Sequence, residues 1–263
     1  MTATPRQAIY PAFRYTDAWA SIASLERAFG FTRGAVFEGP GHTVGHAELH
    51  LGTASIGLNS VTSPQTDNPW TSVRCGIYVA LPDAAAVDAH HAGAVAGGAR
   101  IARPPEDTSY GSHDYSVWDL DGHLWCFGTY TYGPSGAPSL FVDLRYRDAR
   151  VATSWLSEAF GFEPGLQVTD AAGSLVHAEL HRDGNVLMAE SGHDDEWGGE
   201  RQATCVYVTD PEAHHARAVR GGATIARPLA DTPYGARGYT ARDLEGFLWT
   251  FSTYRPQALE GAR

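Results

Sequence analysis

Polar and apolar residues alternate along residues 7 to 16 (QAIYPAFRYT), the first stretch of the chain with a regular pattern. A period of two is typical of a half-buried β-strand, so Tyr10 and Arg14 are expected to share one face of it. Apolar residues then recur at helical spacing between Asp17 and Gly30. Because Asp is favoured just before a helix and Gly just after one, the pattern predicts a helix between these two residues.

The alternation returns after a Gly-rich connection. Residues 44–52 (VGHAELHLG) place His46 and Glu48 on one face, and residues 54–61 (ASIGLNSV) follow as a further strand. With residues 54–61 taken as the fourth strand, this order predicts a βαβββ unit. Beyond a connection rich in Pro, Ser and Thr, a second unit is predicted to begin with the apolar run CGIYVA at residues 75–80.

The chain contains this arrangement twice. Residues 97–130 and 221–254 match position for position at an offset of 124, and the run HAELH recurs with an offset of 131. Such self-similarity indicates tandem copies of one supersecondary unit. We therefore expect an α+β fold of tandem βαβββ modules, forming curved mixed sheets with helices outside. The four modules are expected near residues 7 to 61, 70 to 130, 139 to 190 and 202 to 254, in two domains, 1–133 and 134–263.

The closing stretch of each repeat carries the most specific motif. A Tyr-Gly loop, at Tyr110 and at Tyr234, is followed by Asp-Leu-(Asp/Glu)-Gly and a last strand. This order resembles the second half of a vicinal oxygen chelate domain, the superfamily of glyoxalase I, bleomycin resistance proteins and extradiol dioxygenases. The resemblance extends over nearly the whole chain, and it implies paired modules that form a ligand-binding cup.

In metal-dependent members of that superfamily, four His, Glu or Gln side chains on the concave sheet face hold a divalent metal. Matched by motif, the same positions are Tyr10, Gly57, Cys75 and Cys126 in the first repeat and Phe141, Met188, Thr204 and Thr250 in the second. None of the eight is a carboxylate or an imidazole. The resemblance is therefore to a metal-free branch, and we expect neither a metal nor another cofactor.

The resemblance to bleomycin resistance proteins implies a protein that sequesters an aromatic or peptide-like small molecule, as in antibiotic self-resistance. Arginines in the cup favour carboxylate, phosphate or carbonyl oxygens, and aromatic rims favour a flat ligand. The expected ligand-binding residues are Tyr10, Arg14, His46, Glu48, Tyr110, Phe141, Asp143, Arg145, His177, Glu179 and Tyr234. One alternative is a metal-independent lyase or isomerase, with Glu48, Glu179, His46 and His177 as acid and base groups. A structural or regulatory module is the other.

Several of these residues also have a purely structural interpretation. On a strand, the two histidines of each HAELH lie roughly 13 Å apart at ~3.3 Å per residue, so they cannot share a metal. His-x-Glu on that strand is either a ligand pair or a polar wall. Cys75 and Cys126 are either a thiol pair or buried packing, and Asp143 and Arg145 either neutralise each other or hold a polar ligand. Trp125 and Trp249 are expected in the core, and the pairs His90-His91 and His214-His215 on solvated helix faces.

Composition bears on the number of domains, the partners and the localisation of the protein. A length of 263 residues accommodates two domains, and a hydrophobic content of 43% is that of a globular protein. The formal charge of −11 argues against nucleic acid and anionic membrane surfaces as partners. Three cysteines are too few for a disulfide framework, and no run has the length of a signal peptide or membrane span. We expect a cytoplasmic protein, a monomer that resembles a dimer of two repeats or a homodimer, whose partner is a small organic ligand.

Overall fold

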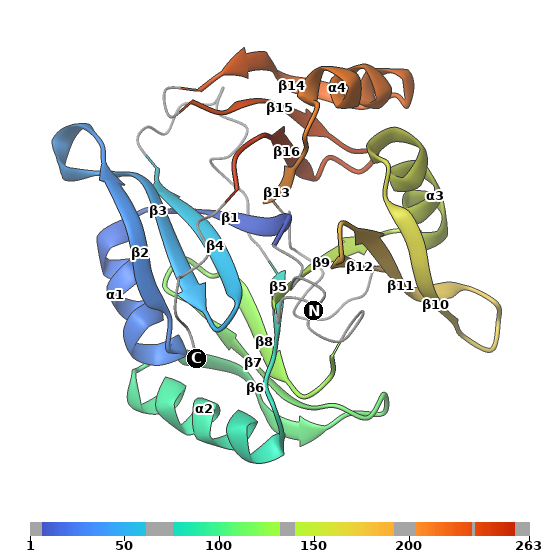
Figure 1. Cartoon of the computed structure of the whole chain (residues 1–263). Helices are drawn as coiled ribbons and strands as arrows, with labels where there is room; N and C mark the ends of the chain where they lie inside the picture. Colours follow the sequence, from blue (N-terminus) through green and yellow to red (C-terminus); the bar gives the residue numbers. More distant parts are fainter. Residues whose placement is uncertain (1–6, 62–75, 132–139, 192–202, 233–234, 256–263) are drawn as a thin grey trace, which may run out of the picture. The chain divides into compact units, whose positions relative to one another are not determined.

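The computed structural model describes residues 7–61, 76–131, 140–191, 203–232 and 235–255 (Figure 1). Within these residues the chain forms four modules, each a strand, a helix and three further strands in that order. The expected α+β fold of tandem βαβββ modules is therefore confirmed.

The first module consists of β1 (Ile9–Tyr15), α1 (Ala18–Phe29), β2 (Thr32–Glu38), the short 3-10 turn η1 (Pro40–His42), β3 (Val44–Leu51) and β4 (Ala54–Ser60). The second consists of β5 (Gly76–Ala80), α2 (Ala84–Ala96), β6 (Arg100–Asp107), β7 (His113–Trp118) and β8 (Leu124–Gly128). The third consists of β9 (Leu140–Tyr146), α3 (Ala149–Phe160), β10 (Glu163–Thr169), β11 (Leu175–Arg182) and β12 (Asn185–Ser191). The fourth consists of β13 (Ala203–Tyr207), α4 (Pro211–Arg220), β14 (Thr224–Asp231), β15 (Arg237–Arg242) and β16 (Leu248–Ser252).

Helix boundaries follow from local chemistry. The Asp17 carboxylate accepts a hydrogen bond from the Ala20 amide at the start of α1, and an aspartate caps each of the other three helices of the described chain in the same way. At the other end of α1, Gly30 adopts the left-handed conformation with φ 72°, which glycine tolerates without steric cost. Both predicted ends of this helix are confirmed.

Within each module the first and fourth strands pair in parallel, and the remaining neighbours are antiparallel. The described strands form two eight-stranded mixed sheets, of order β14-β15-β16-β13-β1-β4-β3-β2 and β10-β11-β12-β9-β5-β8-β7-β6.

The described residues also divide into two compact units. One contains those of residues 12–131 together with 140–141, and the other those of 142–255 together with 7–11. The predicted domain boundary between residues 133 and 134 lies outside the described residues.

The core of each unit is aromatic. In the first, Phe13 of β1 stacks on Trp125 of β8 with ring centroids 5.1 Å apart, and Phe29 of α1 lies 5.6 Å from the same indole. In the second, Phe160 of α3 and Trp249 of β16 are 5.4 Å apart. Trp125 and Trp249 are fully buried, which confirms their expected place in the core.

The histidine pairs on α2 and α4 correct one expectation. His214 is buried and His90 is largely so, and neither lies on a solvated helix face. His90 Nδ1 is 2.6 Å from the Tyr115 hydroxyl and its Nε2 is 3.1 Å from the Phe29 carbonyl, and His214 makes the equivalent contacts with Tyr239 and Phe160. Both imidazoles therefore link a helix to the sheet beneath it.

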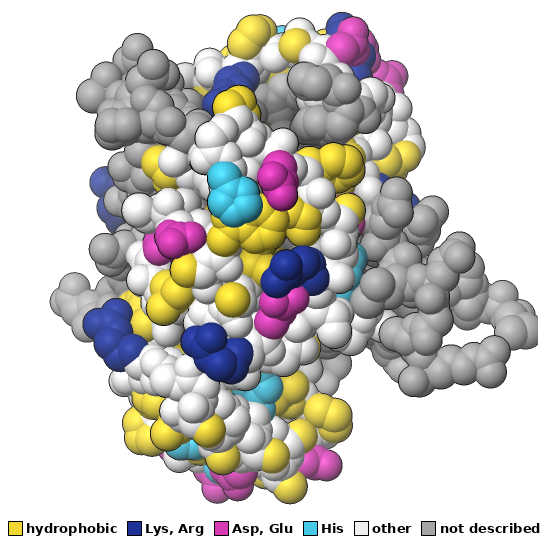
Figure 2. Space-filling model, turned by 90° about the vertical axis from the view of Figure 1, so that its left-hand side faces the viewer, with side chains coloured by type: hydrophobic (Ala, Val, Ile, Leu, Met, Phe, Trp, Pro, Cys, Tyr) yellow, Lys and Arg dark blue, Asp and Glu magenta, His cyan; other side chains and the backbone are white. Residues whose placement is uncertain are grey.

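Among the described residues, no helix combines the length and the apolar composition needed to cross a membrane. On the face of the molecule shown in Figure 2, acidic and basic side chains are interspersed.

Candidate functional site

Each module has a helix on one face of its strands, and we call the opposite face the open face. In the second module, Tyr115 of β7 and Phe127 of β8 contact His90 of α2. Because side chains alternate along a strand, Asp114 and Cys126 point to the open face. The same alternation assigns the open faces of the other three modules, where most of the predicted ligand-binding residues lie.

In the first module, Glu48 of β3 is directly opposite Gly57 of β4, and Gly57 is opposite Ala12 of β1. These pairings place Arg14, His46 and Glu48 on one open face, as the sequence predicts. Glu48 is only 1% exposed, and its carboxylate lies 3.9 Å from His46 Nε2.

Two further contacts occur on this open face. His50 Nδ1 is 2.8 Å from the Ser55 hydroxyl, and burial lowers the pKa of this imidazole despite the opposing charge of Glu48. The Arg14 guanidinium donates to the Ser60 carbonyl at 3.4 Å. The first module therefore presents a buried carboxylate among imidazoles.

The third module has a denser ionic arrangement on its open face. Arg145 of β9 lies 3.4 Å from the Asp143 carboxylate and forms a second ion pair with Glu190 of β12. Glu190 in turn lies 3.1 Å from His177 Nδ1 of β11. We call Asp143, Arg145, His177 and Glu190 the Glu190 cluster. Two carboxylates surround its one guanidinium, so the cluster carries no excess of positive charge.

The remaining predicted residue of this module, Glu179, points to the same face as His177. Its carboxylate lies 2.9 Å from His181 Nε2 and is 7% exposed. The HAELH runs are strands in both repeats, as predicted, so the two histidines of each run stand two strand positions on either side of the glutamate. They do not converge on one point.

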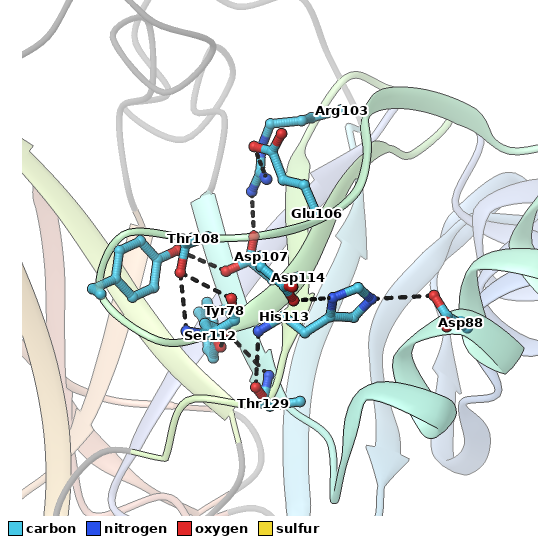
Figure 3. Close-up of polar contacts among 11 residues, drawn as sticks. Tyr78, Asp88, Arg103, Glu106, Asp107, Thr108, Ser112, His113, Asp114 and Thr129 are labelled. Atoms are coloured by element: carbon cyan, nitrogen blue, oxygen red, sulfur yellow. Dashed lines mark hydrogen bonds and ion pairs between the residues drawn. The ribbon is translucent and has the colours of Figure 1, made fainter.

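The open face of the second module contains a set of residues that we call the Asp114 site: Tyr78 of β5, Arg103 of β6, Asp114 and Ser116 of β7, Cys126 of β8, and Tyr110 of the loop between β6 and β7. The Asp114 carboxylate, 0% exposed, accepts hydrogen bonds from the Tyr110 hydroxyl at 2.6 Å and from the Arg103 guanidinium. Arg103 also pairs with Glu106 at 2.7 Å (Figure 3).

Electrostatics keep this network in one protonation state. Burial opposes the charged form of Arg103, but the hydrogen bond and charge of Asp114 outweigh it and raise the pKa of the guanidinium. Burial, followed by the hydrogen bond and charge of Asp114, raises the pKa of Tyr110. Burial also raises the pKa of Tyr78. At neutral pH both phenols are therefore neutral and Arg103 is charged.

Aromatic rings border the Asp114 site. The ring of Tyr78 is 6.4 Å from that of Phe141, and the ring of Tyr110 is 6.2 Å from that of Tyr130. The Tyr78 hydroxyl lies 3.1 Å from the Ser112 hydroxyl and accepts a hydrogen bond from the Tyr130 amide at 2.9 Å. Tyr110 and Phe141, both predicted ligand-binding residues, are thus close to residues that the sequence did not single out.

The fourth module is less polar at the equivalent place. Tyr10 is opposite Cys205, which is opposite Thr250. The ring of Tyr10 is 6.4 Å from that of Tyr254, and the Thr250 and Thr240 hydroxyls are 3.0 Å apart. The assignment of Thr204 to a metal position on the same face as Thr250 was wrong by one residue. In the parallel register, Cys205 is the residue opposite Thr250. Tyr234, like Cys75, lies outside the described residues.

At the positions that the resemblance assigns to the family's metal ligands, the described open-face residues are Tyr10, Gly57, Cys126, Phe141, Met188 and Thr250. None of them offers a carboxylate or an imidazole to a divalent metal. Within the described parts of the chain, no three His, Cys, Asp or Glu side chains gather to hold a metal ion. No chemical step is therefore assigned to a metal.

Sequence reasoning missed Arg103, Asp114 and Glu190. The sequence shows that these residues alternate with core residues, but which of them lie together depends on the register between strands. One available signal was the comparison of the repeats, because Gly238 occupies in the second repeat the position of Asp114 in the first.

Comparisons with known proteins place this geometry in a family. Glyoxalase I from Zea mays has a similar structure, with a TM-score of 0.74 at 17% identity over 94% of this chain and 92% of that one. A putative dioxygenase from Bacillus subtilis matches with a TM-score of 0.63 at 12% identity over 96% of this chain and 86% of that one. TioX from Micromonospora sp. ML1 is 37% identical over 44% of this chain and 97% of that one, with a TM-score of 0.40.

No curated protein matches the chain. The model of one family matches it twice, at residues 9–127 and 140–251. These segments contain all four βαβββ modules, and together they span most of the sequence. The chain therefore belongs to the Glyoxalase/Bleomycin resistance protein/Dioxygenase superfamily.

Proposed function

We propose that this protein binds a small, flat organic molecule on the open faces of its sheets without a metal, and that binding itself is the activity. The observation that carries the proposal is the donor set at the family's metal positions. Gly57, Phe141 and Met188 offer no ligand for a divalent metal, whereas aromatic rings and buried polar groups lie beside them. Apolar walls with a few polar groups are typical of small-molecule sites.

The residues on these faces support a ligand with an aromatic part. Tyr78 and Phe141 are buried neighbours in one unit, and Tyr10 and Tyr254 are neighbours in the other. Rings in such arrangements favour flat partners through offset and edge-to-face contacts. We propose an aromatic or peptide-like compound, sequestered in the cytoplasm by a monomer or homodimer, as in antibiotic self-resistance.

The proposal is tested on tag-free protein by native mass spectrometry against a library of aromatic and peptide-like compounds, with elemental analysis of the same sample. We expect a bound organic molecule at stoichiometric level and no stoichiometric Zn, Ni, Fe or Mn. A metal signal that disappears in the double variant Cys75→Ser/Cys126→Ser contradicts the metal-free part of the proposal. Failure of every compound to bind contradicts the binding part.

A metal-independent lyase or isomerase is the second candidate function. The observation that favours it is the burial of Glu48 and Glu179 beside imidazoles, with His181 Nε2 only 2.9 Å from Glu179. A carboxylate beside an imidazole can exchange a proton with a substrate. If a bound compound is turned over, and Glu179→Gln abolishes turnover while leaving affinity intact, this function replaces the binding function. His181→Gln serves as the matched variant for the imidazole beside Glu179.

A further inference from the structure

We infer that the Asp114 site recognises an uncharged carbonyl group of the ligand, such as an aromatic amide, and that this selectivity belongs to the first repeat. The inference rests on the proposed binding function and adds the chemical class of the ligand. Three features of the site carry it. Two carboxylates neutralise the charge of its arginine, a buried hydroxyl has no partner among the described residues, and the second repeat replaces both features.

The charge of Arg103 is already compensated. Its two terminal nitrogens are bound by Asp114, which is 0% exposed, and by the more exposed Glu106. A ligand carboxylate or phosphate placed beside this guanidinium also meets those two carboxylates. Such an anion loses its hydration at the site, and no unpaired cation there offsets that loss. Binding of an anion is therefore unfavourable. The arginine therefore disfavours an anionic ligand, contrary to what its presence alone suggests.

The Glu190 cluster shows the same balance in the other unit, where Arg145 is bound by Asp143 and Glu190. Each of the two arginines is therefore paired with two carboxylates, and neither site carries an excess of positive charge.

The Ser116 hydroxyl supplies a donor at the Asp114 site. Ser116 is opposite Arg103 on β6 and opposite Cys126 on β8, so it points to the open face between them. It is 0% exposed, and its Oγ has no hydrogen-bond partner among the described residues. A buried hydroxyl without a partner is destabilising and uncommon in folded proteins. The carbonyl oxygen of a ligand satisfies it by accepting its hydrogen bond.

The surroundings define the rest of the ligand. Tyr78 and Phe141 lie with their rings 6.4 Å apart on the same side, and the raised pKa of Tyr78 keeps its phenol neutral. An aromatic group joined to an amide places its ring against these residues and its carbonyl against the Ser116 hydroxyl. The ligand class is therefore an aromatic amide.

The second repeat lacks both features. Gly238 stands at the position of Asp114, so the carboxylate is missing there. Thr240 stands at the position of Ser116, and its hydroxyl is 3.0 Å from that of Thr250, which satisfies it within the protein. The repeats thus provide a matched pair of sites, one with an unsatisfied buried donor and one without.

The test uses the full chain and matched pairs of probes, N-acetyl-L-tyrosinamide with N-acetyl-L-tyrosine and N-acetyl-L-tryptophanamide with N-acetyl-L-tryptophan, titrated by ligand-observed NMR at pH 7. We expect each amide to bind about tenfold or more tightly than its acid, because the acid brings a buried charge. Ser116→Ala should weaken amide binding about five- to tenfold, since one hydrogen bond is lost. Thr240→Val, the matched control in the second repeat, should leave amide binding unchanged.

The outcomes separate the inference from the proposed function. Acids that bind as tightly as amides overturn the inference but leave a binding protein. Amide binding that Ser116→Ala does not change also overturns it. The absence of binding by all four probes overturns it as well, whereas the library screen decides the binding function separately. A structural role for Ser116 is checked by urea unfolding, since Ser116→Ala removes an unsatisfied group and should not lower the stability of the ligand-free protein.

Discussion

The two repeats agree on the helix side of their sheets and differ on the open side. In the first, Asp119 accepts hydrogen bonds from the Tyr15 hydroxyl at 2.6 Å and from the Trp125 indole at 3.2 Å. In the second, Asp243 accepts them from Tyr146 at 2.6 Å and from Trp249 at 3.0 Å. The same aspartates also bind two backbone amides each in the following turn.

On the open side, equivalent positions hold different chemistry. Asp114 corresponds to Gly238, Ser116 to Thr240, Cys126 to Thr250 and Gly128 to Ser252. Packing between the helix and the sheet is common to every copy of the module, whereas the side chains on the open face differ between the copies. The fold therefore constrains the residues on the helix side of each sheet, whereas the residues on the open face can differ between the repeats.

The largest effect is expected on the shared side. Asp119→Ala and Asp243→Ala each remove a carboxylate that accepts four hydrogen bonds, leaving buried donors unsatisfied. Each should lower the free energy of unfolding by about 3 to 5 kcal/mol. Urea unfolding of the two variants measures this. Strongly unequal losses contradict the equivalence of the two networks.

A slightly smaller effect is expected from pH. Burial, with the charge of Arg182 adding to it, lowers the pKa of His214 from 6.5 to about 4. The unfolded chain therefore binds a proton that the folded chain does not. The stability contributed by neutral His214 is complete above pH 6.5 and is lost as the pH falls toward 4, by about 3 kcal/mol at most.

Urea unfolding of the wild type and of His214→Gln at pH 7 and pH 4.5 measures this contribution. The wild type should lose more stability than the variant over that range. His90 has a lowered pKa for the same reason, burial, so His90→Gln is the matched variant in the first repeat. Equal pH dependence in all three proteins contradicts the assignment.

Exchange of one open-face pair should have an asymmetric effect. A Cβ at Gly128 meets the Tyr78 hydroxyl and lies 2.5 Å from Asp114 Cβ. Gly128→Ser should therefore cost about 1 to 3 kcal/mol through overpacking. The reverse change, Ser252→Gly, should cost about 1 kcal/mol, because it adds backbone freedom and removes the hydrogen bond that the Ser252 hydroxyl accepts from the Tyr254 amide. Thermal unfolding compares the two, and a larger cost for Ser252→Gly contradicts the difference between the sites.

The smallest effect is expected at the surface, where a basic side chain joins a helix to a hairpin in each repeat. His113 lies 2.7 Å from Asp107 and 3.2 Å from Asp88 of α2 (Figure 3), and Arg237 pairs with Asp231 and with Glu212 of α4. Hydrogen bonds to Asp107 and Asp88 raise the pKa of His113. The charged contact is present at low pH and is lost as the pH rises through that raised value.

An NMR titration of the His113 imidazole measures the midpoint, which should lie above 6.5. Asp107→Asn should move it back toward 6.5. A midpoint at or below 6.5 in the wild type contradicts the contact. His113→Arg should make hydrogen exchange in this hairpin independent of protonation, as in the second repeat.

The order of strands and helices in the modules can be predicted from the sequence. Alternation, helical spacing, the aspartate before the first helix and Gly30 after it, and two internal offsets defined the βαβββ order, since these signals are local and each module repeats them. Alternation also predicted which residues share a strand face, as for Arg14, His46, Glu48, Asp143, Arg145, His177 and Glu179, and the family resemblance indicated which face is open. A period of two divides the residues of any strand between two faces.

Which of these residues contact one another depends on how the strands pair and the helices pack. The pairing of Arg145 with Glu190, the grouping of Arg103 with Asp114, and the neighbour of Thr250 depend on the register between strands distant in sequence, and a shift of one residue reverses the face. The inward direction of His90 and His214 likewise depends on the tyrosine hydroxyls of the sheet beneath them. Local sequence patterns do not predict such partners, because these contacts form only when the strands and helices assemble.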